Sequence, residues 1–555
     1  MLWRALSDFI SDDIRCPPRS GRDRRDHGRM RRESTLKRHK HKHGRRAPLQ
    51  LSASEFRSSG HRLIDELAEL LGTIHERPVT TSKSPSQVRA LINSSSMPKR
   101  GTPAAKLLRE TTRLLLQDSL FNGHPKFWGY VTSSPAPIGI LGDLLAAGIN
   151  QNVGAFALSP VATEIEAQTI RWIGEMIGYP ANCGGILVSG GNTANFVCFL
   201  AARKAKATWD IRKLGLQHNG MRLRAYCSDE THTWIQKAAD MYGLGTDSVA
   251  FVPSDDHQRI DVQALEKQIR EDIRDGYTPF LLVGNAGTVS TGAVDSLRKL
   301  SAVARKHDLW YHIDGAYGGF AAIQPDAPDD LKAISEADSV AVDPHKWLYA
   351  PLEAGCALVR NPQLLHDTFS FHPPYYRFDD NKEEALINYH EFGPQNSRGF
   401  RALKVWLSIK QVGRRGFERM IADDIALARR LSEDIERYPQ LQTLSYGLSI
   451  TTFRYAPVHT RDGSEKSEAY LNKLNTELLS RLQHSGKAYP SNALVQGKYA
   501  LRVCVVNFRT TLDDILALPQ MVIDIGEQIE KEWEGTGGSL LPSRGSRRSR
   551  KNRGK

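Results

Sequence analysis

The sequence predicts an α/β fold, with a mainly parallel sheet in a large domain and a smaller α+β domain after it. Short apolar runs alternate with helical patterns, as is typical of buried parallel strands. These runs occupy residues 185–189, 223–228, 249–252, 280–284, 309–314 and 339–343. After Phe400 the pattern changes to a long helix and then to alternating strands at 448–455 and 499–506. A chain of 555 residues that is 40% hydrophobic can bury a core in more than one domain.

Two helices are predicted from apolar spacing and capping. Residues 54–71 carry their apolar side chains on one helical face. Pro160 stands at the first position of a second helix, directly after Ser159.

Lys346 lies just beyond the apolar run 339–343, in a segment that reads Asp-Pro-His-Lys-Trp. A lysine at the tip of a buried strand suits an imine-forming amine, because burial lowers a lysine pKa and only the deprotonated amine attacks an aldehyde. A lone lysine is more often an exposed loop residue, so the features upstream decide between the two interpretations.

Asp314 ends another apolar run and is followed by Gly-Ala-Tyr-Gly-Gly. An aspartate at a strand end is often only a turn cap, but the glycines favour the close approach of a flat ligand.

Residues 184–195 offer an anion site. A short strand ends at Ser189, two glycines follow, and a helical pattern opens around Asn192 and Thr193. Backbone N–H groups at a helix start, with the Thr193 hydroxyl, can hold a phosphate. The pattern is neither GxGxxG nor GxxxxGK[ST], which disfavours the common nucleotide-binding loops. An amine, a carboxylate and a phosphate cradle are together what pyridoxal phosphate requires of a protein.

His232 lies between the cradle and Asp314 in the sequence. We expect Ser228 or Asp229 to cap a helix and His232 to fall in its first turn. There the imidazole could lie flat on the cofactor ring and act as an acid or base near neutral pH.

The cradle, His232, the HIDGAYGG segment and the DPHKW segment follow the order and spacing of the group II pyridoxal-phosphate-dependent amino-acid decarboxylases. The chain resembles that family from about residue 127 to about residue 506, including the segments 127–134, 158–166 and 399–406. The resemblance implies a fold-type I enzyme of the aspartate-aminotransferase kind. It also implies a homodimer with composite active sites, and the conversion of an L-amino acid to an amine and CO2.

By this resemblance Lys346 binds the cofactor covalently, His232 stacks on its ring, and Asp314 pairs with the pyridine nitrogen. Ala316 packs against the opposite ring face. The remaining cofactor contacts are expected from Gly191, Asn192, Thr193, Thr288, Asp343 and His345.

The resemblance also places substrate contacts at Tyr130, Ser133 and Arg398, with Arg398 near the substrate carboxylate. Tyr375 corresponds to a loop tyrosine that protonates the substrate carbon after CO2 leaves, and Tyr376 is the alternative. A phenylalanine there is associated with aldehyde formation in some plant relatives, so a tyrosine favours simple decarboxylation.

Two departures leave the substrate open. Aromatic-specific relatives usually carry Asn where this chain has Asp343, and they tend to carry bulky aromatics just before the Ser-Pro, where this chain reads Gly154-Ala-Phe-Ala-Leu-Ser159. An aromatic amino acid is possible, and so is an acidic or diamino acid. An aldehyde synthase or a carbon–carbon lyase on the same scaffold is the alternative activity.

The positive charge belongs to the two ends of the chain. Residues 1–50 hold 15 Lys and Arg against 6 Asp and Glu, and residues 536–555 hold 7 against none, so the net +13 leaves about −3 for the rest. We expect both ends to be disordered, because neither has apolar periodicity. A solvated extension is favoured over a nucleic-acid-binding role, which remains the non-enzymatic alternative.

The remaining patterns narrow the class of protein. No apolar run approaches a membrane span. The six cysteines lack CxxC spacing and follow no secretory signal, which predicts reduced thiols in the cytoplasm. No cluster has metal-ligand spacing, so no metal is expected. The predicted divisions are a basic tail (1–50), a helical segment that packs on the partner subunit (51–125), a cofactor-binding large domain (126–400), a small domain (401–534) and a basic tail (535–555).

Overall fold

The computed structural model describes residues 47–92, 96–216, 220–372 and 386–535, so nearly all of both predicted tails lies outside the described residues. The chain divides into the units 1–57 and 58–555. In the first unit, Ser52 and Glu55 form a reciprocal cap at the start of helix α1 (Ala53–Thr73). Glu55 N donates to Ser52 Oγ (3.2 Å), and Ser52 N donates to Glu55 Oε2 (2.9 Å).

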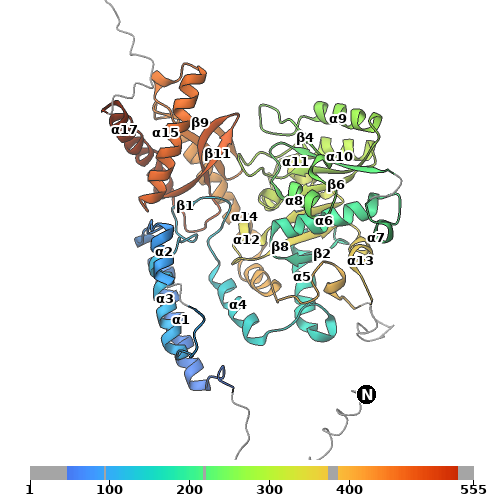
Figure 1. Cartoon of the computed structure of the whole chain (residues 1–555), viewed down its shortest axis with the longest axis horizontal. Coiled ribbons are helices and arrows are strands. Elements are labelled where there is room, and N and C mark those ends of the chain that lie inside the picture. Colours follow the sequence, from blue (N-terminus) through green and yellow to red (C-terminus); the bar gives the residue numbers. More distant parts are fainter. Residues whose placement is uncertain (1–46, 93–95, 217–219, 373–385, 536–555) are drawn as a thin grey trace, which may run out of the picture. The chain divides into compact units, whose positions relative to one another are not determined.

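A seven-stranded sheet lies in the second unit, in the order β2-β8-β7-β6-β5-β3-β4 (Figure 1). The neighbours from β4 through β7 are parallel, and β8 runs antiparallel to both β7 and β2. This confirms the predicted α/β class with a mainly parallel sheet. The bounds are β2 (Gly184–Val188), β3 (Arg222–Ser228), β4 (Val249–Val252), β5 (Tyr277–Asn285), β6 (Trp310–Asp314), β7 (Ser339–Val342) and β8 (Gly355–Val359).

Helices cover this sheet, which is why its central strands read as continuous apolar runs. All residues of β6, β7 and β8 are buried. Helix α6 (Gly191–Lys206) packs across β2, β8, β7, β6 and β5, while α9 (Val262–Arg274) and α10 (Leu297–Lys306) pack on β4, β5 and β6. The helices predicted at 54–71 and from Pro160 are confirmed as α1 and α5. The other helices include α2 (Pro85–Ile92), α3 (Ala104–Asp118), α4 (Pro137–Ile149), α5 (Pro160–Met176), α7 (Ile211–Leu214), α8 (Trp234–Met241), α11 (Asp329–Lys332), α12 (Pro344–Trp347) and α13 (Gln363–Phe369).

A second sheet has five strands in the order β1-β11-β12-β10-β9 and its own apolar core, which includes Phe453, Leu474 and Leu501. The strands predicted at 448–455 and 499–506 correspond to β10 and β12. Strands β1, β9 and β11 were not predicted. The bounds are β1 (Phe127–Trp128), β9 (Leu441–Gly447), β10 (Ile450–Tyr455), β11 (Tyr489–Val495) and β12 (Lys498–Cys504), with helices α14 (Ala402–Ile435), α15 (Glu465–His484), α16 (Leu512–Leu516) and α17 (Leu518–Gly535).

Candidate active site

A cavity of about 430 Å³ opens at the carboxyl ends of the parallel strands. His232 follows β3, Asp314 ends β6, and Lys346 follows β7. Strands that run parallel bring their carboxyl ends to one edge, where ligands bind in open α/β sheets. All ten residues predicted to contact the cofactor line the cavity. Its lining is Ser189, Gly190, Gly191, Asn192, Thr193, Asn195, His232, Asn285, Gly287, Thr288, Val289, Asp314, Ala316, Tyr317, Asp343, His345, Lys346 and Leu352.

The amine of Lys346 faces the carboxylate of Asp343. Helix α12 is a single turn in which Lys346 N donates to Asp343 O (2.9 Å). This turn brings Lys346 Nζ to 3.0 Å from Asp343 Oδ2, and the Asp343 side chain is 2% exposed. Asp343 Oδ1 has no hydrogen-bond partner among the described residues. The turn therefore holds the Lys346 amine within hydrogen-bond distance of a buried carboxylate oxygen.

The carboxylate of Asp314 is fixed by one donor on each oxygen. The indole N–H of Trp234 donates to Asp314 Oδ2 (2.8 Å), and Ala316 N donates to Asp314 Oδ1 (3.1 Å). Both Asp314 and Trp234 are buried. The sequence did not identify Trp234 as part of the site, because an indole in an apolar helical stripe looks like core packing.

The start of α6 forms the predicted anion cradle. Gly190 has φ 134°, a conformation that favours glycine, and Gly191 is the first helical residue. A Cβ on Gly191 would lie 2.6 Å from Asp343 Oδ2 and 3.1 Å from the Cβ of Ala316. The Thr193 hydroxyl lies 3.0 Å from Ser189 Oγ. Open N–H groups and a hydroxyl at a helix start suit a phosphate.

Gly191→Ala is expected to weaken the binding of pyridoxal phosphate, since the new methyl group contacts Asp343 Oδ2 and narrows the cradle. Overpacking of this kind costs about 1–3 kcal/mol, or roughly tenfold or more in Kd. The measurement is a fluorescence titration of apoenzyme with the cofactor. Gly535→Ala, at the end of α17, is the control, because nothing lies within 4 Å of the added Cβ. Equal affinities for the two variants would contradict the cradle.

His232 lies in the turn before α8, not in the first turn of a helix as predicted, because α8 begins at Trp234. Its Nδ1 accepts a hydrogen bond from Trp234 N (3.3 Å). Burial lowers the pKa of His232, with the nearby charge of Asp314 opposing this effect. The ring is therefore neutral near pH 7 and carries its hydrogen on Nε2.

His345 is held by the backbone around it. Its Nδ1–H donates to Ala354 O (2.7 Å), and burial lowers the pKa of His345. Ser133 Oγ donates to His345 O (2.8 Å), so Ser133 supports this segment and does not line the cavity. Thr288 does line it, with its hydroxyl 2.9 Å from Thr291 Oγ1.

Arg398 is not placed at the cavity, contrary to the predicted contact with the substrate carboxylate. Its fully buried side chain pairs with Glu166, with 2.5 Å between Nη2 and Oε1, and donates to Val153 O and Leu187 O (2.7 Å each). Through these contacts the guanidinium of Arg398 joins helix α5, which carries Glu166, to strand β2. Sequence position alone could not reveal them.

Tyr130 does not line the cavity either. Tyr130 has a left-handed backbone (φ 55°) and a side chain that is 57% exposed. Tyr375 and Tyr376 lie outside the described residues. At Gly154, a Cβ would collide with the carbonyl oxygen of Asn396, so packing within this subunit requires the small residue there.

Arg502, on β12, is a residue that sequence reasoning missed. It is 4% exposed, and it donates from Nη1 to Val289 O (2.5 Å), in the cavity wall, and from Nε to Ser491 Oγ (3.0 Å). No carboxylate of the described residues forms an ion pair with it. Burial lowers the pKa of Arg502. No signal in the strand pattern marked this position, because β12 belongs to the other sheet.

A buried histidine lies on β6 behind Asp314. His312 Nε2 is 2.7 Å from Asn195 Oδ1, and Nδ1 is 2.9 Å from Ser339 Oγ. Burial lowers the pKa of His312 to about 4. The unfolded chain takes up a proton near pH 6.5, whereas the folded protein does so only near pH 4. The unfolded state therefore binds more protons in that window, and stability falls as the pH falls through it.

His312→Asn is expected to reduce the slope of the free energy of unfolding against pH between pH 6.5 and 4. The reduction should correspond to the uptake of up to about one proton on unfolding. Urea unfolding at several pH values measures that slope, whatever stability the variant loses at pH 7. His257→Asn, at an exposed position, is the control and should keep the wild-type slope. The account of His312 fails if its variant has the same slope as the control.

The described residues fit pyridoxal phosphate. They provide an amine, a fixed carboxylate, a neutral histidine and a glycine cradle with no space for a Cβ, all on the wall of the same cavity. The cavity is large enough for a small ligand of this kind.

Comparisons with known proteins agree with this fit. Residues 85–455 match the family described as the pyridoxal-dependent decarboxylase conserved domain. The aromatic-L-amino-acid decarboxylase of Bacillus atrophaeus is 34% identical over 482 residues, covering 87% of this chain and 97% of that protein. A phenylacetaldehyde synthase of a Rosa hybrid cultivar is 29% identical, covering 82% of this chain and 90% of that protein. The structure of Catharanthus roseus tryptophan decarboxylase with L-tryptophan superposes with a TM-score of 0.77 at 26% identity, covering 86% of this chain and 99% of that one.

Proposed function

Since this chain belongs to the pyridoxal-dependent decarboxylase family, we propose that the L-amino acid it decarboxylates has an aromatic side chain. Membership of the family confirms the predicted fold type I, the pyridoxal phosphate cofactor and the carboxy-lyase activity. The proposed substrate class rests on the part of the cavity wall that remains free for a substrate side chain.

The chain's own residues have distinct tasks at this site. Pyridoxal phosphate, when bound, supplies an aldehyde for amines and a ring that accepts electrons. Lys346 would provide the amine for that aldehyde, and Asp343 Oδ2, at 3.0 Å, would orient this amine. Asp314 would present a fixed negative charge to the ring nitrogen, and the start of α6 would hold the phosphate. The neutral His232 offers an apolar ring face for stacking.

The part of the cavity wall that is not assigned to the cofactor is uncharged. Its large side chains with apolar or aromatic surface are Val289, Tyr317 and Leu352, and the rest of it is Ser189, Gly190, Asn195, Asn285 and Gly287. Among the described lining residues, every charged group belongs to the set predicted for the cofactor. An acidic or diamino side chain would therefore lie there without a counter-charge, which is costly in a buried site. An aromatic side chain matches such a wall, and the likeness to the Bacillus atrophaeus enzyme supports the same choice.

We propose Arg502 instead of Arg398 for the substrate carboxylate, because Arg502 contacts the cavity wall at Val289 O, although it is not itself a lining residue, and has no ion-pair partner among the described residues. Arg502→Met should raise KM for the amino acid by roughly 10- to 100-fold, since a charge-assisted hydrogen bond is worth about 1.5–3 kcal/mol. Arg398→Met leaves Glu166 unpaired, so it should lower the free energy of unfolding by about 3–5 kcal/mol. Urea unfolding and steady-state kinetics on both variants separate the two roles. A raised KM in a fully stable Arg398→Met protein would reverse the assignment.

A substrate panel tests the aromatic proposal. Holoenzyme is incubated with L-tryptophan, L-tyrosine, L-phenylalanine, L-glutamate and L-2,4-diaminobutyrate, and the amines are identified by mass spectrometry. We expect kcat/KM for at least one aromatic substrate to exceed the values for both charged substrates by 100-fold or more, roughly the cost of an unpaired buried charge. Turnover of glutamate or diaminobutyrate alone would overturn the proposal.

An aldehyde synthase is the second candidate, because the Rosa enzyme is similar over most of this chain. Tyr375, if it is the loop tyrosine, favours the amine product. Ammonia and hydrogen peroxide formed together with an aromatic aldehyde would establish the second candidate, and their absence beside an amine would exclude it.

We further propose a homodimer whose partner covers α4. Leu141, Leu144, Leu145 and Ile149 on this helix are 49–53% exposed, an apolar surface larger than isolated leucines would give. Light scattering after gel filtration measures the mass. We expect a dimer for the wild type and a monomer for a Leu144→Glu, Leu145→Glu variant.

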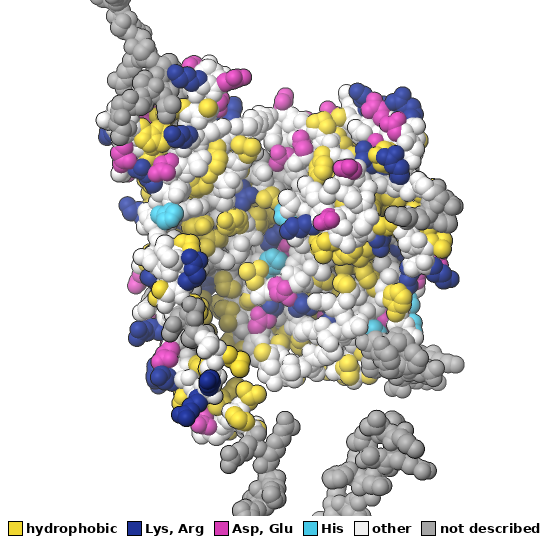
Figure 2. Space-filling model, in the orientation of Figure 1, with side chains coloured by type: hydrophobic (Ala, Val, Ile, Leu, Met, Phe, Trp, Pro, Cys, Tyr) yellow, Lys and Arg dark blue, Asp and Glu magenta, His cyan; other side chains and the backbone are white. Residues whose placement is uncertain are grey.

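A cytoplasmic location is supported by free thiols at Cys183, Cys198, Cys227, Cys356 and Cys504. None of the described helices is long and apolar enough to cross a membrane. On the face drawn in Figure 2, basic and acidic side chains of the described residues are interspersed, which does not favour nucleic acid as a partner.

A further inference from the structure

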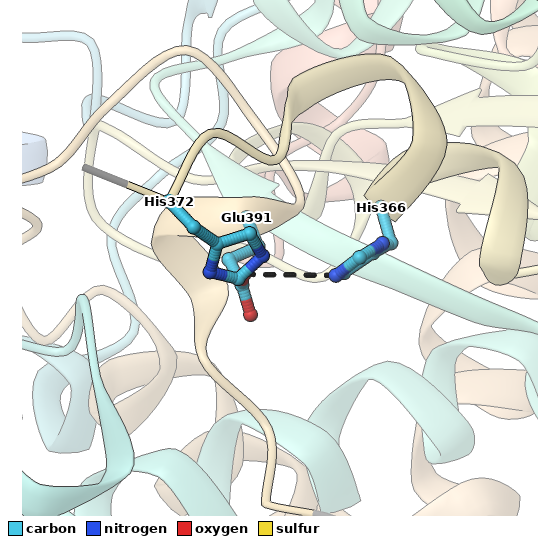
Figure 3. A group of neighbouring side chains, drawn as sticks. All are labelled: His366, His372 and Glu391. Atoms are coloured by element: carbon cyan, nitrogen blue, oxygen red, sulfur yellow. Dashed lines mark ion pairs between the residues drawn. The ribbon is translucent and has the colours of Figure 1, made fainter. Parts of the chain in front are cut away.

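Three polar side chains converge outside the cavity, on the flanks of residues 373–385 (Figure 3). They are His366 on α13, His372 just before that segment, and Glu391 in the 3-10 helix Tyr389–Glu391 after it. Glu391 Oε1 is 3.0 Å from His372 Nε2 and 3.6 Å from His366 Nε2. One ligand atom from each residue lies within 4.8 Å of the other two.

These separations match those of a metal centre. Bonds of about 2.0–2.2 Å from Zn²⁺ to nitrogen and oxygen, at tetrahedral angles, place the ligand atoms roughly 3.4 Å apart. Two imidazoles and one carboxylate, with a remaining position for water, form a familiar zinc ligand set. Nitrogen ligands also favour zinc and its first-row neighbours over magnesium and calcium.

Within residues 47–92, 96–216, 220–372 and 386–535, no lysine or arginine lies in an ion pair with the carboxylate of Glu391. Glu391 is 7% exposed, and among the described residues its carboxylate contacts the two imidazoles and the Ser370 hydroxyl (3.0 Å). A metal ion held by the same two histidines would supply a positive charge to this buried carboxylate.

The surrounding chain orients the ligands. Arg212 Nη1 donates to Asp367 O (2.8 Å), and Nη2 donates to Ser370 O (2.6 Å), which fixes the turn between the two histidines. The amide of Gln363 lies 3.4 Å from His366 Nδ1 and donates to Asp367 Oδ1 (2.9 Å), so polar groups flank the ring nitrogen opposite the Nε2 that faces Glu391.

We propose that His366 Nε2, His372 Nε2 and Glu391 Oε1 bind a divalent transition-metal ion of the zinc class, with water completing the coordination. The ion replaces the 2.8 Å contact between Ser370 Oγ and His372 Nε2. It joins the chain on both sides of residues 373–385 without entering the cofactor cavity. The site is independent of the proposed substrate, because none of its three ligands lines that cavity.

Isothermal titration of chelator-treated holoenzyme with Zn²⁺ tests this site. We expect one tight site per chain, weakened by at least about 100-fold in His372→Ala and in Glu391→Gln. His257→Ala, at an exposed histidine outside the cluster, is the matched control. A His39→Ala, His41→Ala, His43→Ala variant separates zinc binding by the N-terminal histidines from binding by the cluster.

Zinc K-edge absorption on the variant that lacks the three N-terminal histidines identifies the ligands. Two imidazoles and oxygen donors are the expected shell. The proposal is overturned if wild-type protein binds no zinc, or if the tight site survives His372→Ala and Glu391→Gln but disappears in the N-terminal variant. Because titration reports binding alone, a failure here is distinct from a failure to turn over aromatic amino acids.

Discussion

Replacing Lys346 by alanine is expected to abolish the covalent attachment of pyridoxal phosphate and to lower decarboxylation by roughly 10³-fold or more. That is the scale of losing a covalent catalytic group. Lys346 is the only lysine among the described lining residues, and its Nζ lies 3.0 Å from Asp343 Oδ2. Borohydride reduction followed by peptide mass spectrometry locates the attached cofactor, so the test does not depend on activity.

Two variants complete this experiment. Lys206→Ala removes a lysine that pairs with Asp308 (2.6 Å) away from the cavity, and it should leave labelling and turnover unchanged. Lys346→Arg keeps the charge beside Asp343 but cannot form the imine, so it should be as inactive as the alanine variant. Labelling of another lysine with full turnover in Lys346→Ala would refute the assignment.

Asp314→Asn should have the second largest effect, a loss of roughly 10²- to 10³-fold in kcat. This is the range found when a fixed electrostatic partner of the reacting group is removed. The amide keeps the size of the carboxylate but removes its charge. Trp234→Phe should lose less, about 10- to 100-fold, since it removes one hydrogen bond to a charged group and leaves the charge in place. Steady-state kinetics and cofactor titration measure both variants.

Trp310→Phe is the matched control for Trp234. Its indole also donates a buried hydrogen bond of 2.8 Å, but to the neutral Ser339 hydroxyl. A positioning role for Trp234 predicts a change in kcat and in the visible spectrum of the bound cofactor that Trp310→Phe does not produce. Equal changes in kcat and in the spectrum for the two variants would show that Trp234 contributes only packing.

The sequence predicts the cavity well because every cofactor residue follows an apolar run. Runs that form parallel strands bring their carboxyl ends together, so His232, Asp314 and Lys346 meet although the sequence separates them widely. No strand was predicted at residues 355–359, which form β8. An apolar run also does not show whether a strand is parallel or antiparallel to its neighbours, as β8 is antiparallel to β7.

Partners from other elements set the rest of the site. The sequence does not show that Arg398 pairs with Glu166. It also does not show that Arg502, on β12, contacts Val289 in the cavity wall. The cluster of His366, His372 and Glu391 escaped the search for metal-ligand spacing, since its third member comes from beyond residue 385. Such pairings depend on tertiary contacts, which local patterns do not encode.

The most direct test of the central claim is the stoichiometry of products from holoenzyme and an aromatic L-amino acid. Amine, CO2, ammonia and hydrogen peroxide are measured in the same reaction. We expect one amine for each CO2. Ammonia and hydrogen peroxide should not exceed the background amounts measured with the Lys346→Ala variant. Equal amounts of CO2, ammonia and aldehyde, or the absence of CO2 with every aromatic substrate, would contradict it.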